Sequence, residues 1–410
     1  MIAAETPAER ISGSREQRSI SSATLAGVAV YFILSGAIFV YAGIERLAND
    51  WYWLDDLHYF YRAAVLLDNG QPDLLYDTQA RVALGFSGAE GWEVFPYPAG
   101  LALLYEPLTS MDYQSARFVF AGLSVAALLG VVAIAYRWSR DGRFALLLLL
   151  AIATHFTVYE VIRFSQLAPI LALITAAAVV SIDQMRPVRG AIFTGLLAFK
   201  PSLFVAPLAL LIWRLRFHWA ALAVLFMGAL ILVAAQVWLV GGEGIRLYLE
   251  QLGRYRDEAF VLDGQFTAGA GWMLNWNGFI GRLFVVDPQP WMVVPFWTAT
   301  AAVLAVVWLR QDTLTCWLAG SLATLIIVPH VLWYEWVILF GVAPFVLYRN
   351  RSPMLLPLML ALHFSVSLDS YFTVTNPAEE SYVFFTTLVA ASILVYLAAT
   401  GHRVRLRAGL

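Results

Sequence analysis

The stretch WYWLDDLHYFYRAA, residues 51–64, places two adjacent carboxylates, Asp55 and Asp56, within a group of aromatic side chains. A carboxylate within hydrogen-bond reach of a hydroxyl group can take its proton while the hydroxyl oxygen forms a new bond. The simpler interpretation is helix capping, because Asp is among the preferred N-cap residues. Capping needs only one acid. Either Asp55 or Asp56 is therefore a candidate reactive carboxylate, and capping stays the open alternative.

A lysine provides the second chemical candidate, inside the apolar block GAIFTGLLAFKPSLFVAPLALLIW at 190–213. Pro201 follows Lys200 and should break a helix there, because proline lacks the N–H that a helix interior requires. A lysine at membrane depth is costly and marks a functional site by default. The alternative is a lysine that extends to the membrane surface. The block is expected to form two short spans or a re-entrant hairpin.

The elements that position these residues follow from composition. The chain has 410 residues, of which 60% are hydrophobic and only 13% charged, against about 25% charged residues in soluble domains. The apolar residues gather in blocks of about 17 to 23 residues, the length that crosses a bilayer as a helix. We predict an all-α, polytopic membrane protein with about 11–12 membrane segments in one domain, residues 1–410. The predicted segments are 22–44, 114–136, 143–159, 166–182, the broken block 190–213, 218–240, 291–309, 313–329, 333–348, 353–368 and 382–400.

Arginines in the short connections indicate the orientation. If every predicted segment spans, the arginines between segments and at both ends fall on one side, which should be the cytoplasm. Both termini are then cytoplasmic. Two long loops, 45–113 and 241–290, lie on the opposite side, and Asp56 belongs to the first of them. Apolar positions after Asp56 recur at helical spacing and predict an amphipathic helix on the outer surface; they are Leu57, Phe60, Tyr61 and Ala64.

Further polar residues are expected near the same outer face. Arg163 belongs to the short connection 160–166, together with Glu160 and Gln166. His330 and Glu335 lie at a turn between two predicted segments. Each of these side chains could equally be an interfacial anchor or a helix-end group. The single cysteine, Cys316, excludes a disulfide framework, and no metal-ligand spacing is present, so we expect no metal.

Five segments together resemble glycosyltransferase family 87, whose members are multi-spanning GT-C enzymes. DDLHYFYRAAVLLDNGQPDLLYD is similar to the family's first outer loop, and VFPYPAGLALLYEPL to its Phe-x-Tyr-Pro-Pro segment. EVIRFSQLAPILA, GLLAFKPSLFVAPLALL and VPHVLWYEWVILF resemble its Gly-Gln, Lys-Pro and Pro…Tyr-Asp (or Pro…Trp-x-His) segments. The departures are Ala99 in place of a second proline and Ser165 in place of glycine, while Glu335 stands where an acid or histidine is expected. The matches occur in the family's order over residues 50 to 340.

The resemblance implies a GT-C-type helical bundle and an inverting sugar transfer at the outer face of a bacterial inner membrane. The donor would be a polyprenyl-phosphate sugar of the mannose or arabinofuranose class, and the acceptor a glycolipid or polysaccharide. No cofactor is implied. The implied roles are catalysis by Asp56, with Asp55 or Glu335 as alternatives; donor-phosphate binding by Lys200, Arg163 and His330; and substrate binding by Arg62, Tyr97, Gln166 and Tyr334. A transporter or flippase remains the alternative, because broken membrane helices with a charge at depth also occur there.

Overall fold

The computed structural model describes residues 22–49, 56–77, 95, 97–215, 218–258, 273–284, 288–328, 331–350, 352–375 and 385–400. Within these ranges the regular structure is helical, and the only β-type pairing is an isolated bridge between Met273 and Leu332. The predicted all-α fold is confirmed.

The helices begin and end as follows. They are α2 (Ser22–Asn49), α3 (Leu57–Asp68), η1 (Pro72–Tyr76), α5 (Ala99–Leu103), η3 (Glu106–Leu108), α6 (Tyr113–Ser139), α7 (Gly142–Ala153), α8 (Phe156–Arg163), α9 (Ala168–Asp183), α10 (Pro187–Leu196), η4 (Leu197–Phe199), α11 (Pro201–Leu215), α12 (Trp219–Glu258), α14 (Trp276–Phe284), α15 (Pro290–Arg310), α16 (Thr313–Ile327), η5 (Trp333–Gly341), α17 (Ala343–Arg349), α18 (Leu355–Thr375) and α19 (Thr386–Thr400). The η elements are 3-10 helices.

Several of these helices are long and apolar enough to cross a membrane. Five described helices meet that condition, namely α2, α6, α12, α15 and α18. A sixth span results if α7 and α8, which meet at a bend of 64°, count as one. Shorter apolar helices, including α9, α16 and α19, occupy other predicted segments. The chain is therefore a multi-pass membrane protein by helix length and composition. The count of about 11–12 segments included the shorter helices and stays a prediction.

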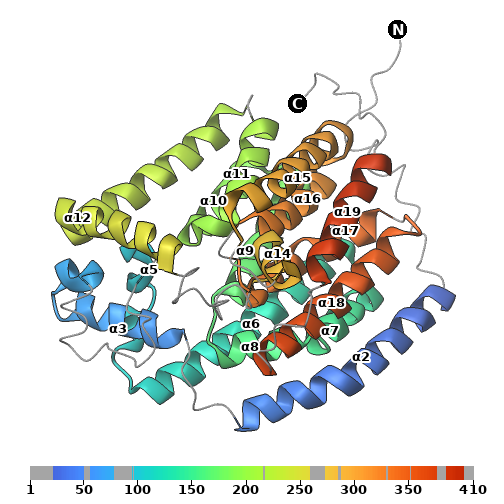
Figure 1. Ribbon diagram of the computed structural model, residues 1–410, viewed down its shortest axis with the longest axis horizontal. Coiled ribbons are helices and arrows are strands. Elements are labelled where there is room, and N and C mark those ends of the chain that lie inside the picture. Colours follow the sequence, from blue (N-terminus) through green and yellow to red (C-terminus); the bar gives the residue numbers. More distant parts are fainter. Residues whose placement is uncertain are drawn as a thin grey trace.

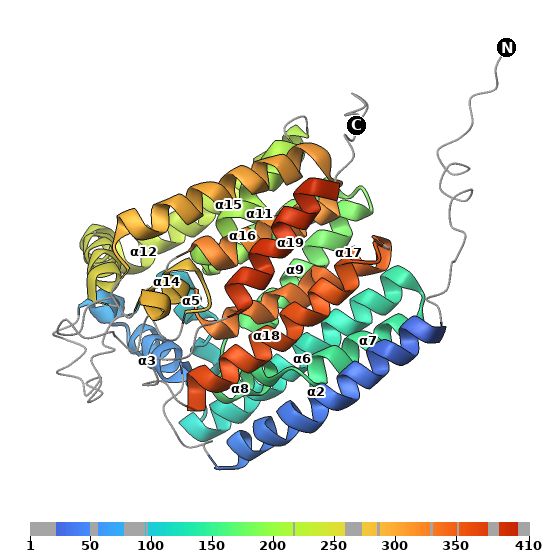
Figure 2. The same cartoon turned by 45° about the vertical axis from the view of Figure 1, so that its right-hand side comes forward.

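The long helices lie side by side and form one bundle (Figure 1). Helix α9 is central and packs against α6, α10 and η5. Helix α2 runs along one edge of the bundle, where it contacts α7 and α8 (Figure 2). The short helices α3 and α5 gather at one end of the bundle, and α17 lies toward the other end in both views. The described parts of the first predicted outer loop thus form short helices at one end of the bundle.

The predicted break at Lys200 is present. Helix α10 ends at Leu196, the 3-10 turn η4 follows, and α11 begins at Pro201, with Lys200 at a non-helical φ of −125° and ψ of 83°. Proline at the first helical position is favourable, because its missing N–H has no partner there anyway.

The predicted segment 333–348 is not one α-helix. It consists of the 3-10 helix η5 followed by α17, and every residue of η5 is buried. This segment packs closely against α9, since a Cβ added at Gly341 would lie only 2.3 Å from the carbonyl oxygen of Ala172. Only glycine permits this approach between the two backbones.

Candidate active site

Asp56 directly precedes α3, as the predicted amphipathic helix requires. Leu57, Phe60 and Ala64 are buried, while Tyr61 is half-buried and donates a hydrogen bond of 2.7 Å to the carbonyl oxygen of Met111. These contacts fix the start of α3 against the bundle.

The Asp56 side chain does not cap this helix. Its backbone is helical (φ −72°, ψ −17°), and its carboxylate makes no capping hydrogen bond. The Asp56 N–H donates to the carbonyl oxygen of Phe164 at 3.0 Å. Its Oδ2 accepts hydrogen bonds from Nε2 of Gln166 and from the hydroxyl of Tyr334, the latter at 3.4 Å. The carboxylate therefore joins the starts of three segments that are far apart in the sequence.

Gln166 reaches Asp56 because of a tight turn between α8 and α9. Ser165 has a φ of +55°, and the Gln166 N–H donates to the carbonyl oxygen of Val161 at 2.9 Å. This left-handed conformation explains why the resembled family segment has glycine where this chain has Ser165, since glycine adopts positive φ without steric cost. Gln166 is buried, and its amide is held toward Asp56.

Lys200 and Glu335 form a buried ion pair next to the same tyrosine. The distance from Nζ of Lys200 to Oε1 of Glu335 is 2.5 Å, and the two side chains are 6% and 2% exposed. Nζ of Lys200 also lies 5.1 Å from the ring centroid of Tyr334. Among the described residues, Oε2 of Glu335 has no hydrogen-bond partner although it is buried. A buried polar atom of this kind requires an explanation, and a substrate hydroxyl is a suitable partner.

Aromatic rings form a wall beside the two carboxylates. The ring of Tyr97 lies 5.0 Å from that of Phe60, which stacks on Tyr105 at 4.7 Å. Burial raises the pKa of Tyr97 well above its usual value, and the negative charges of Asp56 and Glu335 raise it further. The Tyr97 hydroxyl therefore keeps its proton and remains able to donate a hydrogen bond.

Two glutamines of α12 hold this wall in place, and the sequence analysis missed them. Nε2 of Gln236 donates to the hydroxyl oxygen of Tyr76 at 2.9 Å, and that hydroxyl donates to the carbonyl oxygen of Tyr97 at 2.8 Å. Nε2 of Gln251 donates to the carbonyl oxygen of Tyr76 at 2.6 Å. The sequence did contain one sign of Gln236, because it is a polar side chain within the apolar run 218–240. Polar side chains inside membrane helices usually have partners.

The electrostatic environment of Asp56 suits a proton acceptor. Burial raises the pKa of its carboxyl group, while the hydrogen bond from Gln166, the positive charge of Lys200 and the hydrogen bond from Tyr334 act in the opposite direction. The net direction is upward. A higher pKa makes a carboxylate a better base as long as it remains ionised at the working pH.

Arg163 is placed differently from its prediction. It lies on α8 rather than in a loop, it is buried, and its Nη2 lies 2.7 Å from Oε2 of Glu160. Arg46 also approaches Glu160, at 3.5 Å. The carbonyl oxygen of Arg163 accepts a hydrogen bond from Arg117 at 3.1 Å. Arg163 is thus already paired with a carboxylate.

The remaining predicted residues lie elsewhere. Arg62 is half-buried on α3; burial lowers its pKa, and the nearby Tyr113 and Tyr59 act against that shift. Asp55 and His330 fall outside the described residues. Within the described residues, no group of three or more His, Cys, Asp or Glu side chains is arranged to hold a metal ion.

Comparison with known proteins places the chain in a family. Residues 95–332 match the sequence profile of Glycosyltransferase family 87, which is more than half of the chain. The match includes Tyr97, Gln166 and Lys200, and Asp56 precedes it while Tyr334 and Glu335 follow it. No curated protein and no solved structure matches the chain.

Proposed function

Because the chain belongs to glycosyltransferase family 87, we propose that this membrane glycosyltransferase uses a polyprenyl-phosphate sugar as its donor. The sugar belongs to the mannose or arabinofuranose class, and the acceptor is a hydroxyl group of a glycolipid or polysaccharide. The transfer inverts the anomeric centre. The family favours this function over the transporter or flippase that the broken helices alone left open.

In the proposed reaction, the acceptor oxygen forms a bond to the anomeric carbon of the donor sugar. The bond from that carbon to the phosphate oxygen breaks, and its electron pair stays on the lipid phosphate. The acceptor proton passes to the Asp56 carboxylate. A positioned base supports this step, because a neutral hydroxyl is a poor nucleophile near neutral pH.

One observation carries the proposal: Tyr334 contacts both a half-buried carboxylate, Asp56, and a buried ammonium group, Lys200. Asp56 is the base. Lys200 stabilises the charge that develops on the leaving phosphate, as preorganised cations do in low-dielectric sites. Glu335 holds Lys200 before the donor binds and is the alternative base.

The other roles follow from position. Tyr97 and Gln166 border Asp56 and bind the sugar or the acceptor. Arg62, on α3, binds the acceptor. Lys200 and Arg163 are both paired with carboxylates. Lys200 ranks first as a phosphate ligand, because it lies beside Tyr334, which contacts Asp56. His330 keeps its proposed role in phosphate binding, and Asp55 remains the second choice for the base. The enzyme acts at the outer face of a bacterial inner membrane, with both termini in the cytoplasm.

The experiment is sugar transfer in proteoliposomes from a panel of polyprenyl-phosphate sugars to lipid-linked acceptors. Wild-type protein should use one donor, and Asp56→Asn should not turn it over. Asp68→Asn is the matched control, because Asp68 is an exposed acid at the other end of α3. Turnover of none of the polyprenyl-phosphate donors, with turnover of a nucleotide sugar instead, would reject the proposal.

A further inference from the structure

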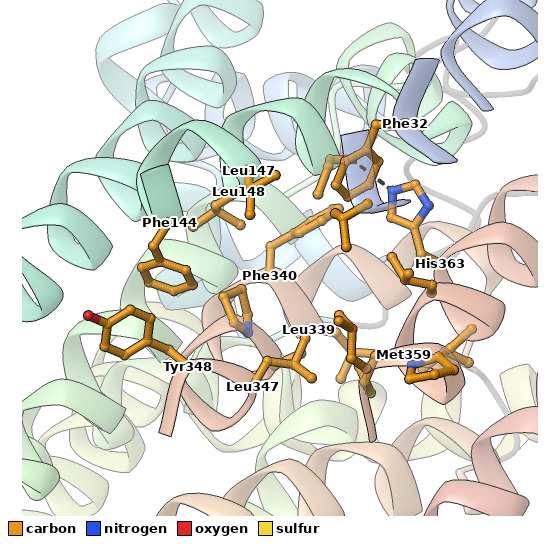
Figure 3. A pocket seen from close by; sticks show the side chains of 18 of the residues that line it. Phe32, Phe144, Leu147, Leu148, Leu339, Phe340, Leu347, Tyr348, Met359 and His363 are labelled. Atoms are coloured by element: carbon orange, nitrogen blue, oxygen red, sulfur yellow. Dashed lines mark hydrogen bonds between the residues drawn. The ribbon is translucent and has the colours of Figure 1, made fainter. Parts of the chain in front are cut away.

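A large cavity lies in the bundle, and its lining extends from Trp336, the residue after Glu335, to the far end of α17. Its volume is about 670 Å³, and α2, α7, η5, α17 and α18 surround it. Most lining side chains are hydrocarbon or aromatic, as in Phe32, Leu148, Leu339 and Met359. Figure 3 shows such side chains pointing into the shared space, with Phe144 and Tyr348 at one end and Phe32 and His363 at the other.

The two ends of the cavity differ in polarity. Asp141, Asn350 and Ser352 line it where α7 begins and α17 ends. At the other end, both ring nitrogens of His363 are already bonded, at 2.9 Å to the carbonyl oxygen of Ala151 and at 2.9 Å to the hydroxyl of Tyr31. The polar groups at the first end also have partners. Asp141 accepts hydrogen bonds from the N–H groups of Arg143 and Phe144, and Ser352 bonds Asn350 and the hydroxyl of Tyr396. The first end therefore differs in carrying three polar side chains, whereas the second carries a histidine whose ring nitrogens are both bonded.

The polar end and the candidate active site lie at opposite ends of the segment formed by η5 and α17. Tyr334 and Glu335 stand at the start of η5, and Asn350 directly follows α17. Nine residues of 3-10 helix and seven of α-helix, which the non-helical Val342 separates, have a combined rise of at most about 28 Å. This upper bound is close to the thickness of a hydrocarbon core, about 30 Å. The polar end also adjoins Arg140, Arg143 and Arg349, which belong to the arginine-rich side of the sequence.

The cavity is partly open and its walls are mostly apolar. Apolar side chains that line such a space gain dispersion contacts when hydrocarbon occupies it. Water does not fill the gap well, because it needs several polar partners that the apolar walls do not provide. Two surrounding helices, α2 and α18, are candidate membrane spans, so lipid chains are the available hydrocarbon.

We propose that this cavity binds one acyl chain of a membrane phospholipid, whose head group remains at the end formed by Asp141, Asn350 and Ser352. The chain extends between α7 and α18 toward His363. This lipid differs from the sugar donor. The distinction rests on the proposed function, which places the donor phosphate near Lys200 at the opposite end of η5.

The test is photo-crosslinking of the full-length protein in lipid nanodiscs. The probe is a phospholipid with a diazirine in its acyl chain, and peptide mass spectrometry locates the adducts. We expect adducts on cavity residues such as Leu339 and Met359. Leu148→Trp should remove them by filling the cavity, whereas Leu146→Trp should not, because Leu146 lies on the same helix but is 56% exposed. Adducts on the exposed Trp238 of α12 should persist in both variants.

A second arm uses a polyprenyl phosphate with a diazirine in its isoprenoid chain. We expect it to leave the cavity residues unlabelled. Labelling by this probe and not by the phospholipid would overturn the proposal and make the cavity part of the donor site. Absence of cavity adducts from either probe, or equal cavity labelling in Leu148→Trp and wild type, would also overturn it. If Leu148→Trp does not fold, Ala343→Leu fills the cavity from α17 with a smaller change.

Discussion

The ammonium group of Lys200 lies 2.5 Å from the carboxylate of Glu335, and both side chains are buried. Glu335 is adjacent in the chain to Tyr334, whose hydroxyl lies 3.4 Å from Oδ2 of Asp56. The ion pair thus adjoins the proposed base. It also creates a difficulty for mutagenesis, because removal of either partner leaves an isolated charge in a low-dielectric site.

The first prediction separates stability from catalysis in this pair. Lys200→Met or Glu335→Gln alone should destabilise the protein by about 3–5 kcal/mol, the range for breaking a buried ion pair. The double variant Lys200→Met/Glu335→Gln should regain most of that stability, because no unpaired charge remains. It should still transfer sugar poorly, since the phosphate loses about 2–4 kcal/mol of charge stabilisation.

Thermal unfolding in detergent and transfer rates in proteoliposomes measure the two effects. Near-wild-type transfer by the double variant would assign the pair a purely structural role.

The second prediction concerns the pH dependence of the wild-type enzyme. Burial raises the pKa of Asp56, and only the ionised carboxylate accepts a proton. Transfer should therefore decline as the pH falls through this raised pKa. The acidic limb of kcat/KM should lie above the usual Asp range near 4. A rate that stays constant down to pH 4 in a folded enzyme would be inconsistent with Asp56 as a buried base.

The third prediction uses a substitution at Gln166 to shift the acidic limb of the pH profile of kcat/KM. The hydrogen bond from Gln166 lowers the pKa of Asp56, so Gln166→Leu should raise this pKa and shift the acidic limb to higher pH. Gln184→Leu, at the exposed end of α9, is the control and should leave the limb unchanged. A lower rate with an unmoved limb would show that Gln166 binds substrate without tuning the base.

The fourth prediction tests membrane orientation. In a Cys316→Ala background, Asp73→Cys should react with an impermeant thiol reagent applied outside intact cells, and Arg143→Cys should not. Both native side chains are exposed in the structure, so access depends only on the side of the membrane. The opposite labelling pattern would place the site on the cytoplasmic face.

Local features of this fold were predictable from the sequence. The helix after Asp56 followed from apolar spacing, and the break before α11 followed from Pro201, because both depend on neighbouring residues. The single α-helix predicted for 333–348 was wrong. The 3-10 helix η5 packs closely against α9 at Gly341, and a contact between distant segments leaves no local pattern.

The same limit applies to the candidate site. Asp56, Gln166, Lys200 and Glu335 were each selected, yet nothing in the sequence paired Lys200 with Glu335 or Gln166 with Asp56. Hydrophobic periodicity indicates which face of a helix is buried, but it does not fix which residue of another helix lies opposite. Arg163 shows the consequence, since its pairing with Glu160 became visible only once α8 was known to be a helix.

The most direct test of the central claim is the transfer rate of Asp56→Asn relative to wild type, with donor binding measured in parallel. Asparagine keeps the size of the side chain and an oxygen that can accept the hydrogen bond from Gln166, but it cannot act as the base. We predict normal folding, retained binding of the polyprenyl-phosphate donor and a loss of transfer of at least about 10²-fold, as expected for a general base. Transfer within a few-fold of wild type would contradict the account, and Glu335 would then be the carboxylate to test as the base.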